Sequence, residues 1–343
     1  MPRQPSLKIT ETYYGYETLQ MLLNVDTKRA DYPTDEMFIS TKEQSKLRNI
    51  LAGCKYNKKA DVYEKLLTFQ KKKYEKKDCE SGEENYYGRL RPTNGKSLQS
   101  SKKFLRKVMS NGNVIGFDLS NSQPSLLYQL CCKYGAYGGF HYLKAYVSNR
   151  DSINQEISKH YGVSDGAAKE LIIRIMFGGG IQSWKTDNNV KVENNLDFVT
   201  ELQKEITDIA GEVAPGFPDF GKAYTVYLIN KENGDLAEGS DIRKSALALY
   251  LQNIEGDVML LCGKHLKKMG IEVRTPIHDE INVVCTQDVL DNKEDIMCKL
   301  QLIVKEKLSF DVKFKVEDYS MSAEETQQVE NHRKFLKNDE DNV

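Results

Sequence analysis

The chain has 343 residues and almost no net charge, because 49 Lys and Arg residues face 50 Asp and Glu residues. This length is enough for a large hydrophobic core with two or three lobes. No apolar run approaches membrane-spanning length, and the N-terminal segment lacks the apolar core of a signal peptide. We therefore expect a soluble, intracellular protein with no membrane partner. The seven cysteines show no C-x-x-C or zinc spacing, so reduced thiols are expected.

The charges are unevenly distributed along the chain. Lys55–Lys77 holds nine Lys against three acids, and Tyr87–Met109 holds seven Lys or Arg against none. Glu317–Val343 holds eight acids against three bases. A single basic helix is often only a solvated surface, but two basic blocks in succession favour a nucleic-acid partner. Residues 324–343 are predicted to form an acidic, disordered tail.

The first 85 residues are predicted to be mainly helical and basic. Leu47, Ile50 and Leu51 have helical spacing, which predicts a helix over Thr41–Asn57. Asp61–Lys77 also fits a helix, with Val62, Leu66 and Phe69 on one face. Residues 79–85, CESGEEN, are expected to be a loop and the boundary of this lobe.

Asp118 follows a short apolar run, Val114 to Phe117, that is typical of a buried strand. Taken alone, Asp118 would best be read as the cap of a helix that begins near Pro124. A second acidic pair, Asp279-Glu280, lies between two further strand-like runs. Its turn would bring Asp279 to the sheet edge beside Asp118. Two carboxylates on neighbouring strands suit a two-magnesium phosphoryl-transfer site.

The remaining elements alternate between helices and a few strands. Apolar spacing predicts helices over Pro124–Tyr134, Tyr142–Val147, Ser152–Tyr161, Ala167–Phe177, Asn195–Gly211, Ile242–Lys268 (one helix or two) and about Val289–Leu308. Residues 228–239 resemble a hairpin or loop, and Val312–Val316 alternates as a strand does. The order predicts an α+β fold, a sheet domain with a large helical insertion.

One predicted helix carries a pattern of possible chemical meaning. Lys169, Ile173 and Phe177 fall at i, i+4 and i+8, on one face, and a run of three glycines follows. The pattern would suit a triphosphate at the Lys end and a base at the aromatic end. By itself, an ordinary amphipathic helix explains it better.

Taken together, the motifs within residues 86–323 resemble those of the family A (pol I-like) DNA polymerases. The family's T-G-R-L and L-Q segments are similar to Tyr87–Leu90 and Leu98-Gln99, and its motif A, D-Y-S-Q-I-E, is similar to Asp118–Gln123. Its fingers motif resembles Ala167–Lys169 with Phe177-Gly178, its Gln and Asp five apart resemble Gln252 and Asp257, and motif C is His278-Asp279-Glu280. Five matches in the family's order are hard to obtain by chance.

The resemblance implies a polymerase palm, an antiparallel sheet with helices, from residues 86–128 and 242–323. Helical fingers would span 129–241, and 1–85 would be a short thumb-like region. The implied reaction is template-directed addition of deoxynucleotides to a primer 3′-hydroxyl. The implied partners are a DNA primer-template, dNTPs and a helicase or other replication protein.

The resemblance also implies roles for individual residues. Two Mg²⁺ ions, or Mn²⁺ in their place, would be held by Asp118, Asp279 and the backbone carbonyl of Leu119. The expected nucleotide-binding residues are Lys169, which also counts as catalytic, with Ser120, Gln123, Phe177 and Arg174. The expected primer-template residues are Arg89, Gln99, Gln252 and His278.

Three departures from the family pattern bear on function. The family's Arg before the Lys is Asp165 here, so Arg174 or Lys159 is expected to replace it. Gln123 and Phe177 replace a Glu and a Tyr, which predicts weak discrimination against ribonucleotides. A single-subunit RNA polymerase, a primase-like enzyme or an inactive nucleic-acid-binding palm remain alternatives. Only about 86 residues precede the Tyr87–Leu90 segment, so no proofreading exonuclease is expected; compact polymerases of viruses and mobile elements are similar.

Overall fold

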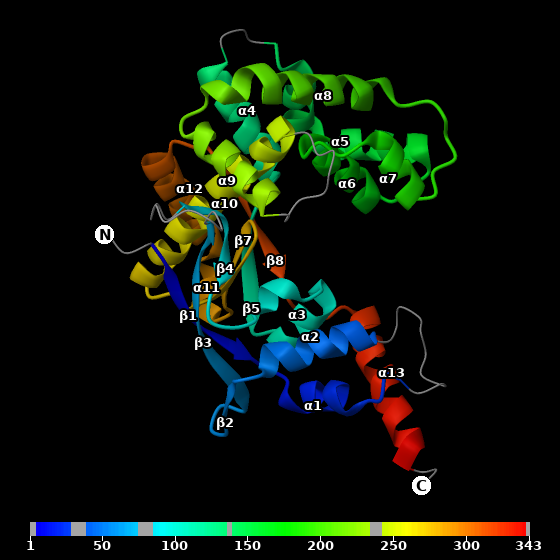
Figure 1. Cartoon of the computed structure of the whole chain (residues 1–343). Helices are drawn as coiled ribbons and strands as arrows, with labels where there is room; N and C mark the ends of the chain where they lie inside the picture. Colours follow the sequence, from blue (N-terminus) through cyan, green and yellow to red (C-terminus); the bar gives the residue numbers. More distant parts are fainter. Residues whose placement is uncertain (1–4, 29–38, 75–84, 136–138, 234–241, 341–343) are drawn as a thin grey trace.

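A four-stranded antiparallel sheet in the order β6-β7-β5-β8 lies at the centre of the molecule (Figure 1). The computed structural model describes residues 5–28, 39–74, 85–135, 139–233 and 242–340. The strands are β5 (Val114–Leu119), β6 (Val273–Ile277), β7 (Glu280–Val284) and β8 (Phe314–Asp318). The register sets Asp118 opposite Glu280 on β7 and Lys315 on β8. The strand predicted over Val114 to Phe117 and the two strands predicted around the Asp279 turn are therefore confirmed.

A second antiparallel sheet lies beside the first and contains most of the N-terminal region. Its strands are β1 (Leu7–Tyr13), β2 (Lys55–Asn57), β3 (Val62–Tyr74) and β4 (Asn85–Pro92). The central strand β3 pairs with each of the other three. Because β3 and β4 belong to one sheet, the division expected at residues 79–85 would cut through that sheet; residues 79–84 themselves lie outside the described ranges.

The helix predicted over Asp61–Lys77 is wrong as far as the structure describes it, since Val62–Tyr74 is a strand. The apolar residues used for that prediction do not share a face: Leu66 is 61% exposed, whereas Phe69 is fully buried. Burial instead alternates through Leu67, Phe69 and Lys71, which is the period of a strand. The first 85 residues are thus a mixture of strands and helices.

Four helices pack together beyond the sheets, at the bottom of Figure 1. They are α1 (Tyr16–Asn24), α2 (Thr41–Leu51), α3 (Lys103–Ser110) and α13 (Ala323–Glu340). A capping box between Ser40 and Glu43 starts α2. The helix predicted there is confirmed to Leu51, but its last residues form β2.

The disordered tail predicted for residues 324–343 is wrong for the part that the structure describes. Helix α13 buries Val329 in the same apolar cluster as α1 and α2. His332 is fully buried, and its Nε2 accepts a hydrogen bond from the backbone N–H of Ile39 at 2.9 Å. Buried residues of this acidic segment, Val329 and His332, therefore attach its helix to the rest of the protein.

The predicted helical insertion between β5 and β6 is confirmed and fills the top of Figure 1. Its helices are α4 (Ser122–Tyr134), α5 (His141–Tyr161), α6 (Asp165–Met176), α7 (Ile181–Asp187), α8 (Asp197–Asp208) and α9 (Phe220–Glu232). The two helices predicted over 142–147 and 152–161 are one helix, α5, with a kink at Asn149. The hairpin or loop predicted for 228–239 is helical to Glu232, and 234–241 lie outside the described ranges.

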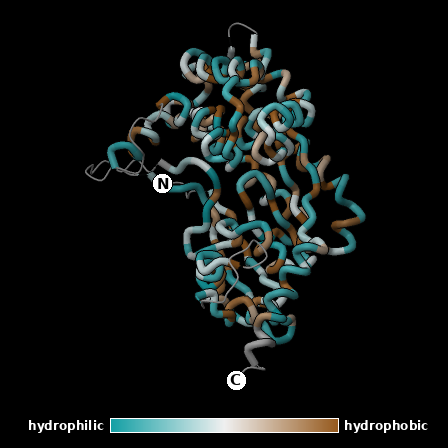
Figure 2. Tube along the Cα trace, turned by 90° about the vertical axis from the view of Figure 1, so that its right-hand side faces the viewer, coloured by the Kyte–Doolittle hydropathy of each residue, from teal (hydrophilic) through white to brown (hydrophobic). Residues whose placement is uncertain are grey.

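Helix α10 (Ile242–Lys268) connects the insertion to the sheets, and it is one continuous helix. Helices α11 (Gln287–Asp291) and α12 (Lys293–Leu308) follow β7. A Cβ on Gly256 would lie 2.5 Å from the carbonyl oxygen of Gly88, so α10 approaches β4 as closely as backbone permits. Figure 2 shows hydrophobic segments running through the interior of the sheets and the helical lobe. The α+β fold is confirmed, and none of the described helices has the length and hydropathy to cross a membrane.

Candidate active site

The structure brings Asp118 and Asp279 together at the end of the central sheet. Asp118 lies near the end of β5, and the backbone N–H of Leu119 donates to the carbonyl of Asp279 at 3.0 Å. Asp279 belongs to the two-residue turn between β6 and β7, which His278 allows by adopting a positive φ of 58°. Both carboxylates line a cavity of about 330 Å³.

The opposite wall of this cavity comes from the helical lobe. Lys169 and Ile173 of α6 and Phe177, directly after α6, all line it, so the face predicted from their spacing points into the cavity. Gln123 from α4 and Arg150 from α5 complete the wall. A basic side chain and an aromatic ring thus face two carboxylates across a space bounded by the sheet and the lobe.

The carboxylates of Asp118 and Asp279 lie close enough to repel each other, although basic side chains line the same cavity. Burial, Glu255 and Asp118 together raise the pKa of Asp279 to about 7. Burial also raises the pKa of Asp118, although Lys315 opposes the rise through an ion pair of 3.0 Å. A cation between the carboxylates would relieve this repulsion.

The residues present fit a magnesium site of the kind that substrate phosphates complete. Among the described residues no group of three His, Cys, Asp or Glu side chains could hold a metal on its own. Mg²⁺ is usually bound by one or two carboxylates together with waters and substrate phosphates. Asp118 and Asp279 supply two such carboxylates. Leu119, which follows Asp118 and donates its backbone N–H to the carbonyl of Asp279, lines the same cavity.

Glu255 is a buried member of the site that the sequence reasoning missed. It is fully buried on α10 and accepts hydrogen bonds from Arg89 Nε at 2.8 Å, Ser122 Oγ at 2.8 Å and Gln123 Nε2 at 3.0 Å. The signal was present in the sequence: Glu255 falls within the apolar positions Leu251, Ile254 and Val258, at helical spacing. A carboxylate on a buried stripe needs partners, and these three supply them.

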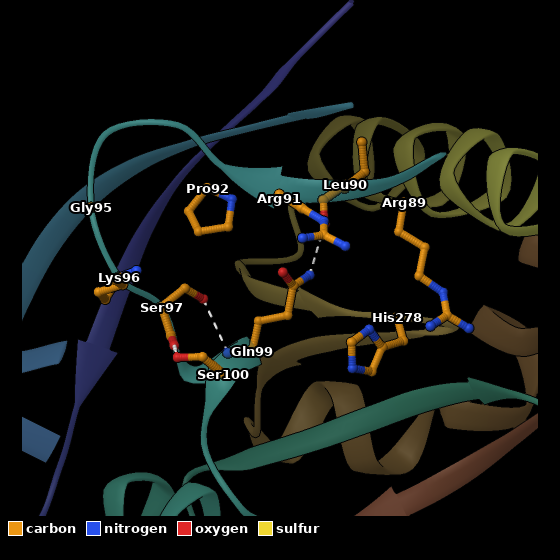
Figure 3. Close-up of a pocket in the computed structure, with 10 residues that line it drawn as sticks. All are labelled: Arg89, Leu90, Arg91, Pro92, Gly95, Lys96, Ser97, Gln99, Ser100 and His278. Atoms are coloured by element: carbon orange, nitrogen blue, oxygen red, sulfur yellow. Dashed lines mark hydrogen bonds between the residues drawn. The ribbon is translucent and has the colours of Figure 1, made fainter. Parts of the chain in front are cut away.

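A second cavity of about 410 Å³ adjoins the turn that carries Asp279 (Figure 3). Arg89 and His278 lie on one side of it, and Lys96 and Ser97 lie on the other. The side-chain nitrogen of Gln99 donates to the carbonyls of Leu90 at 2.9 Å and Pro276 at 2.8 Å, which ties β4 to β6.

The second cavity is basic at its mouth. Arg91 and Lys96 are exposed there, and no acidic side chain lines it. Loss of hydration and the neighbouring guanidinium groups of Arg89, Arg106 and Arg91 lower the pKa of His278 to about 4, so its ring is neutral at pH 7. Arg89 lines both cavities.

Several residues predicted for the site are not brought to it. Arg174 is ion-paired with Glu170 at 2.9 Å and Asp187 at 2.6 Å, and it lines neither cavity. Ser120, Gln252 and Lys159 also line neither cavity. Besides Glu255, the sequence reasoning missed Arg150 and Lys315, which both line the first cavity.

Comparisons with known proteins give distant similarities in sequence and in structure. No family model matches the chain. A Sputnik virophage protein named "Putative helicase V13" is 26% identical over 226 residues, which are 66% of this chain and 27% of that protein. The chain therefore matches about a quarter of that relative's length. Among solved structures, the POL domain of Pol1 from M. smegmatis, in complex with DNA primer-template and dNTP, is similar with a TM-score of 0.48 and 11% identity, over 90% of this chain and 66% of that chain.

Proposed function

We propose that the chain is a template-directed DNA polymerase that adds deoxynucleotides to a primer 3′-hydroxyl. The observation that carries this proposal is that Asp118, on β5, and Asp279, in the turn before the neighbouring strand β7, line one cavity together with Lys169. Nucleotidyl transfer needs carboxylates that hold divalent cations and a cation that holds the phosphates of the nucleotide. The cavity presents both, on opposite walls.

Asp118, Asp279 and the carbonyl of Leu119 would hold two Mg²⁺ ions, for which Mn²⁺ can substitute. When bound, these ions lower the pKa of the attacking hydroxyl and neutralise the leaving phosphates. Lys315 pairs with one oxygen of Asp118 at 3.0 Å and would help to keep this carboxylate ionised for metal binding. Asp279, whose pKa is raised to about 7, would bind a metal ion in its ionised form.

The nucleotide occupies the cavity between α6 and the sheet. Lys169 attracts its phosphates, Phe177 stacks beside its base, and Gln123 lies near its sugar. Pyrophosphate leaves as the bond between the primer oxygen and the α-phosphorus forms.

The primer-template follows the second cavity. Arg89, Gln99 and His278 border the path, and the exposed Arg91 and Lys96 provide contacts to phosphate groups. The name of the virophage relative supports a helicase as a partner activity in replication.

Primer extension tests the proposal. We expect the full chain to extend a primer on a DNA template with Mg²⁺ and not with EDTA. Asp118→Asn and Asp279→Asn should each reduce the rate about a thousandfold or more. Asp295→Asn is a matched control, because Asp295 is an exposed carboxylate that pairs with Lys299 on α12. Equal extension by all four proteins would contradict the proposal.

A ribonucleotide-using polymerase is a second candidate, and the contacts of Gln123 favour it. Its amide nitrogen donates to Glu255, so its carbonyl oxygen is the atom left to meet a sugar hydroxyl. Extension with rNTPs in place of dNTPs separates the two candidates.

A further inference from the structure

The cavity between α6 and the central sheet has four basic side chains in its wall: Arg89, Arg150, Lys169 and Lys315. Two of them are already neutralised by carboxylates. Arg89 is paired with Glu255 at 2.8 Å, and Lys315 is paired with Asp118 at 3.0 Å. Among the described residues, neither Arg150 nor Lys169 makes an ion pair of this kind.

We infer that Arg150 is the second phosphate-binding cation of this cavity and acts with Lys169 on the polyphosphate of a nucleoside triphosphate. The inference rests on the proposed function and names a residue that the family pattern does not supply. Arginine suits this role because its planar guanidinium can donate two parallel hydrogen bonds to one phosphate.

Arg150 lies one helical turn after Tyr146 on α5, and both residues line the cavity. Asn149 departs from helical geometry, with φ −133° and ψ 35°, immediately before Arg150. Neighbouring positions 148, 149 and 151 are exposed, whereas Arg150 is half-buried and lines the cavity. Its Nε is buried and, in the described part of the chain, has no hydrogen-bond partner. A buried donor without a partner is costly unless a ligand completes it.

The other basic residues that could replace the missing arginine are engaged or lie elsewhere. Asp165, which stands at that position of the family pattern, is exposed and accepts a hydrogen bond from Ser158 at 2.8 Å. Arg174 is held between Glu170 and Asp187 and does not line the cavity. Because α5 and α6 pack against each other, Arg150 and Lys169 belong to the same wall and face the same end of a ligand.

Direct binding tests this assignment without requiring catalysis. The affinities of dTTP and dTMP are measured by calorimetry for the full chain, in Mg²⁺ and without primer. Arg150→Gln should weaken dTTP binding about ten- to a hundredfold and leave dTMP binding almost unchanged. Arg150→Lys, which keeps the charge, should recover part of the loss. Arg174→Gln is the matched control and should bind dTTP as the wild type does.

Two results would overturn the inference: wild-type dTTP affinity in Arg150→Gln, or an equal loss of dTTP and dTMP affinity in a folded variant. If Arg150→Gln does not fold, as judged by circular dichroism, Arg150→Lys decides by the same comparison, with a smaller loss expected for dTTP only. Primer extension run in parallel keeps the two proposals apart. A wild type that binds dTTP through Arg150 but extends no primer contradicts the polymerase and supports the inference, whereas extension with an indifferent Arg150 contradicts the inference alone.

Discussion

At the scale of single residues, the site combines several buried acids whose charges are only partly balanced. Glu280 is 8% exposed, and Tyr319 donates to its Oε2 at 3.2 Å. Its Oε1 has no partner among the described residues and lies against Gly116, where a Cβ would be 1.8 Å away. Burial is the main reason that the pKa of Glu280 rises to about 7.

Glu280→Gln should therefore change how stability depends on pH. The folded chain holds the Glu280 proton more tightly than the unfolded chain does, so the stabilisation is complete below pH of about 4.5 and is lost as pH rises through about 7. The variant should be more stable than the wild type at pH 8, by up to about 3 kcal/mol, and equal to it at pH 4. Urea unfolding in EDTA across this range measures the difference.

Glu317→Gln is the control for that experiment. Glu317 lies on β8, which is separated from β7 by β5, and it is ion-paired with Lys103 and Lys315. Removing it should not produce the gain at pH 8. The same pH profile for Glu280→Gln and the wild type would show that Glu280 ionises normally.

Gln123 and Glu255 form the other pair whose behaviour can be tested residue by residue. Gln123→Glu would set two carboxylates at the present separation of 3.0 Å, so the single substitution should reduce dNTP incorporation. Exchanging the pair, in Gln123→Glu with Glu255→Gln, restores one donor and one acceptor and should recover it. If Gln123 contacts the sugar, the exchanged variant should also discriminate against rNTPs about ten- to a hundredfold more than the wild type. An unchanged dNTP/rNTP ratio would remove Gln123 from the sugar site.

At the scale of elements, helix α10 connects the cavity lined by Asp118 and Asp279 to the N-terminal sheet. Asn253 Oδ1 accepts hydrogen bonds from Lys71 at 2.7 Å and from the backbone N–H of Gly88 at 3.1 Å. Asp257 is ion-paired with Lys71 at 2.7 Å. These contacts fall on one helical face, which holds β3 and β4 in place.

Gly256→Ala tests the close approach of α10 to β4. Its new methyl group would lie 2.5 Å from the carbonyl oxygen of Gly88, and backbone cannot yield cheaply. We expect a loss of about 1–3 kcal/mol in the free energy of unfolding, measured in urea. Gly221→Ala, on α9, is the control because nothing lies within 4 Å of its Cβ position. It should be neutral or slightly stabilising, since alanine favours helix; equal losses in both variants would mean that the contact at Gly88 does not matter.

The elements also show what sequence could and could not predict. Val114 to Phe117 and the His278 turn were predictable, because each apolar run is short and bounded by a polar residue. Strand β3 was not, since its apolar residues fit two periods, and only its pairing with three strands decides between them. The same limit applies to the site. Lys169 has a signal in its own helix, whereas the contact between Arg89 and Glu255 joins residues 166 positions apart.

At the scale of the whole molecule, the net charge is near zero, although the segments Lys55–Lys77 and Tyr87–Met109 are basic. Not every lysine of these segments is available to a polyanion: Lys71 is buried in its ion pair, and Lys65 donates to the carbonyl of Ala52 at 2.8 Å. Arg91 and Lys96 are exposed at the mouth of the second cavity. Arg91 and Lys96 are therefore two exposed positive charges that border the candidate site.

Binding to a primer-template duplex should weaken steeply with salt. Each phosphate contact releases condensed counterions, so Arg91→Gln and Lys96→Gln should each lower the slope of log K against log salt by about one. Fluorescence anisotropy between 50 and 200 mM salt, typical values for such measurements, gives the slopes. Lys299→Gln is the control, because Lys299 is exposed and paired with Asp295 on α12. If the affinity for the primer-template did not depend on salt, Arg91 and Lys96 would not bind its phosphate groups.

The position of Arg89 between the two cavities has a thermodynamic consequence. Arg89 lines the second cavity, where the primer-template is proposed to bind. Its only carboxylate partner among the described residues is Glu255, which also accepts a hydrogen bond from Gln123 in the first cavity. The carboxylate of Glu255 thus interacts with residues of both cavities. If a DNA phosphate binds Arg89 in place of Glu255, Glu255 keeps only its hydrogen bonds from Gln123 and Ser122. If DNA binding changes the affinity for a nucleotide by some factor in this way, nucleotide binding must change the affinity for DNA by the same factor.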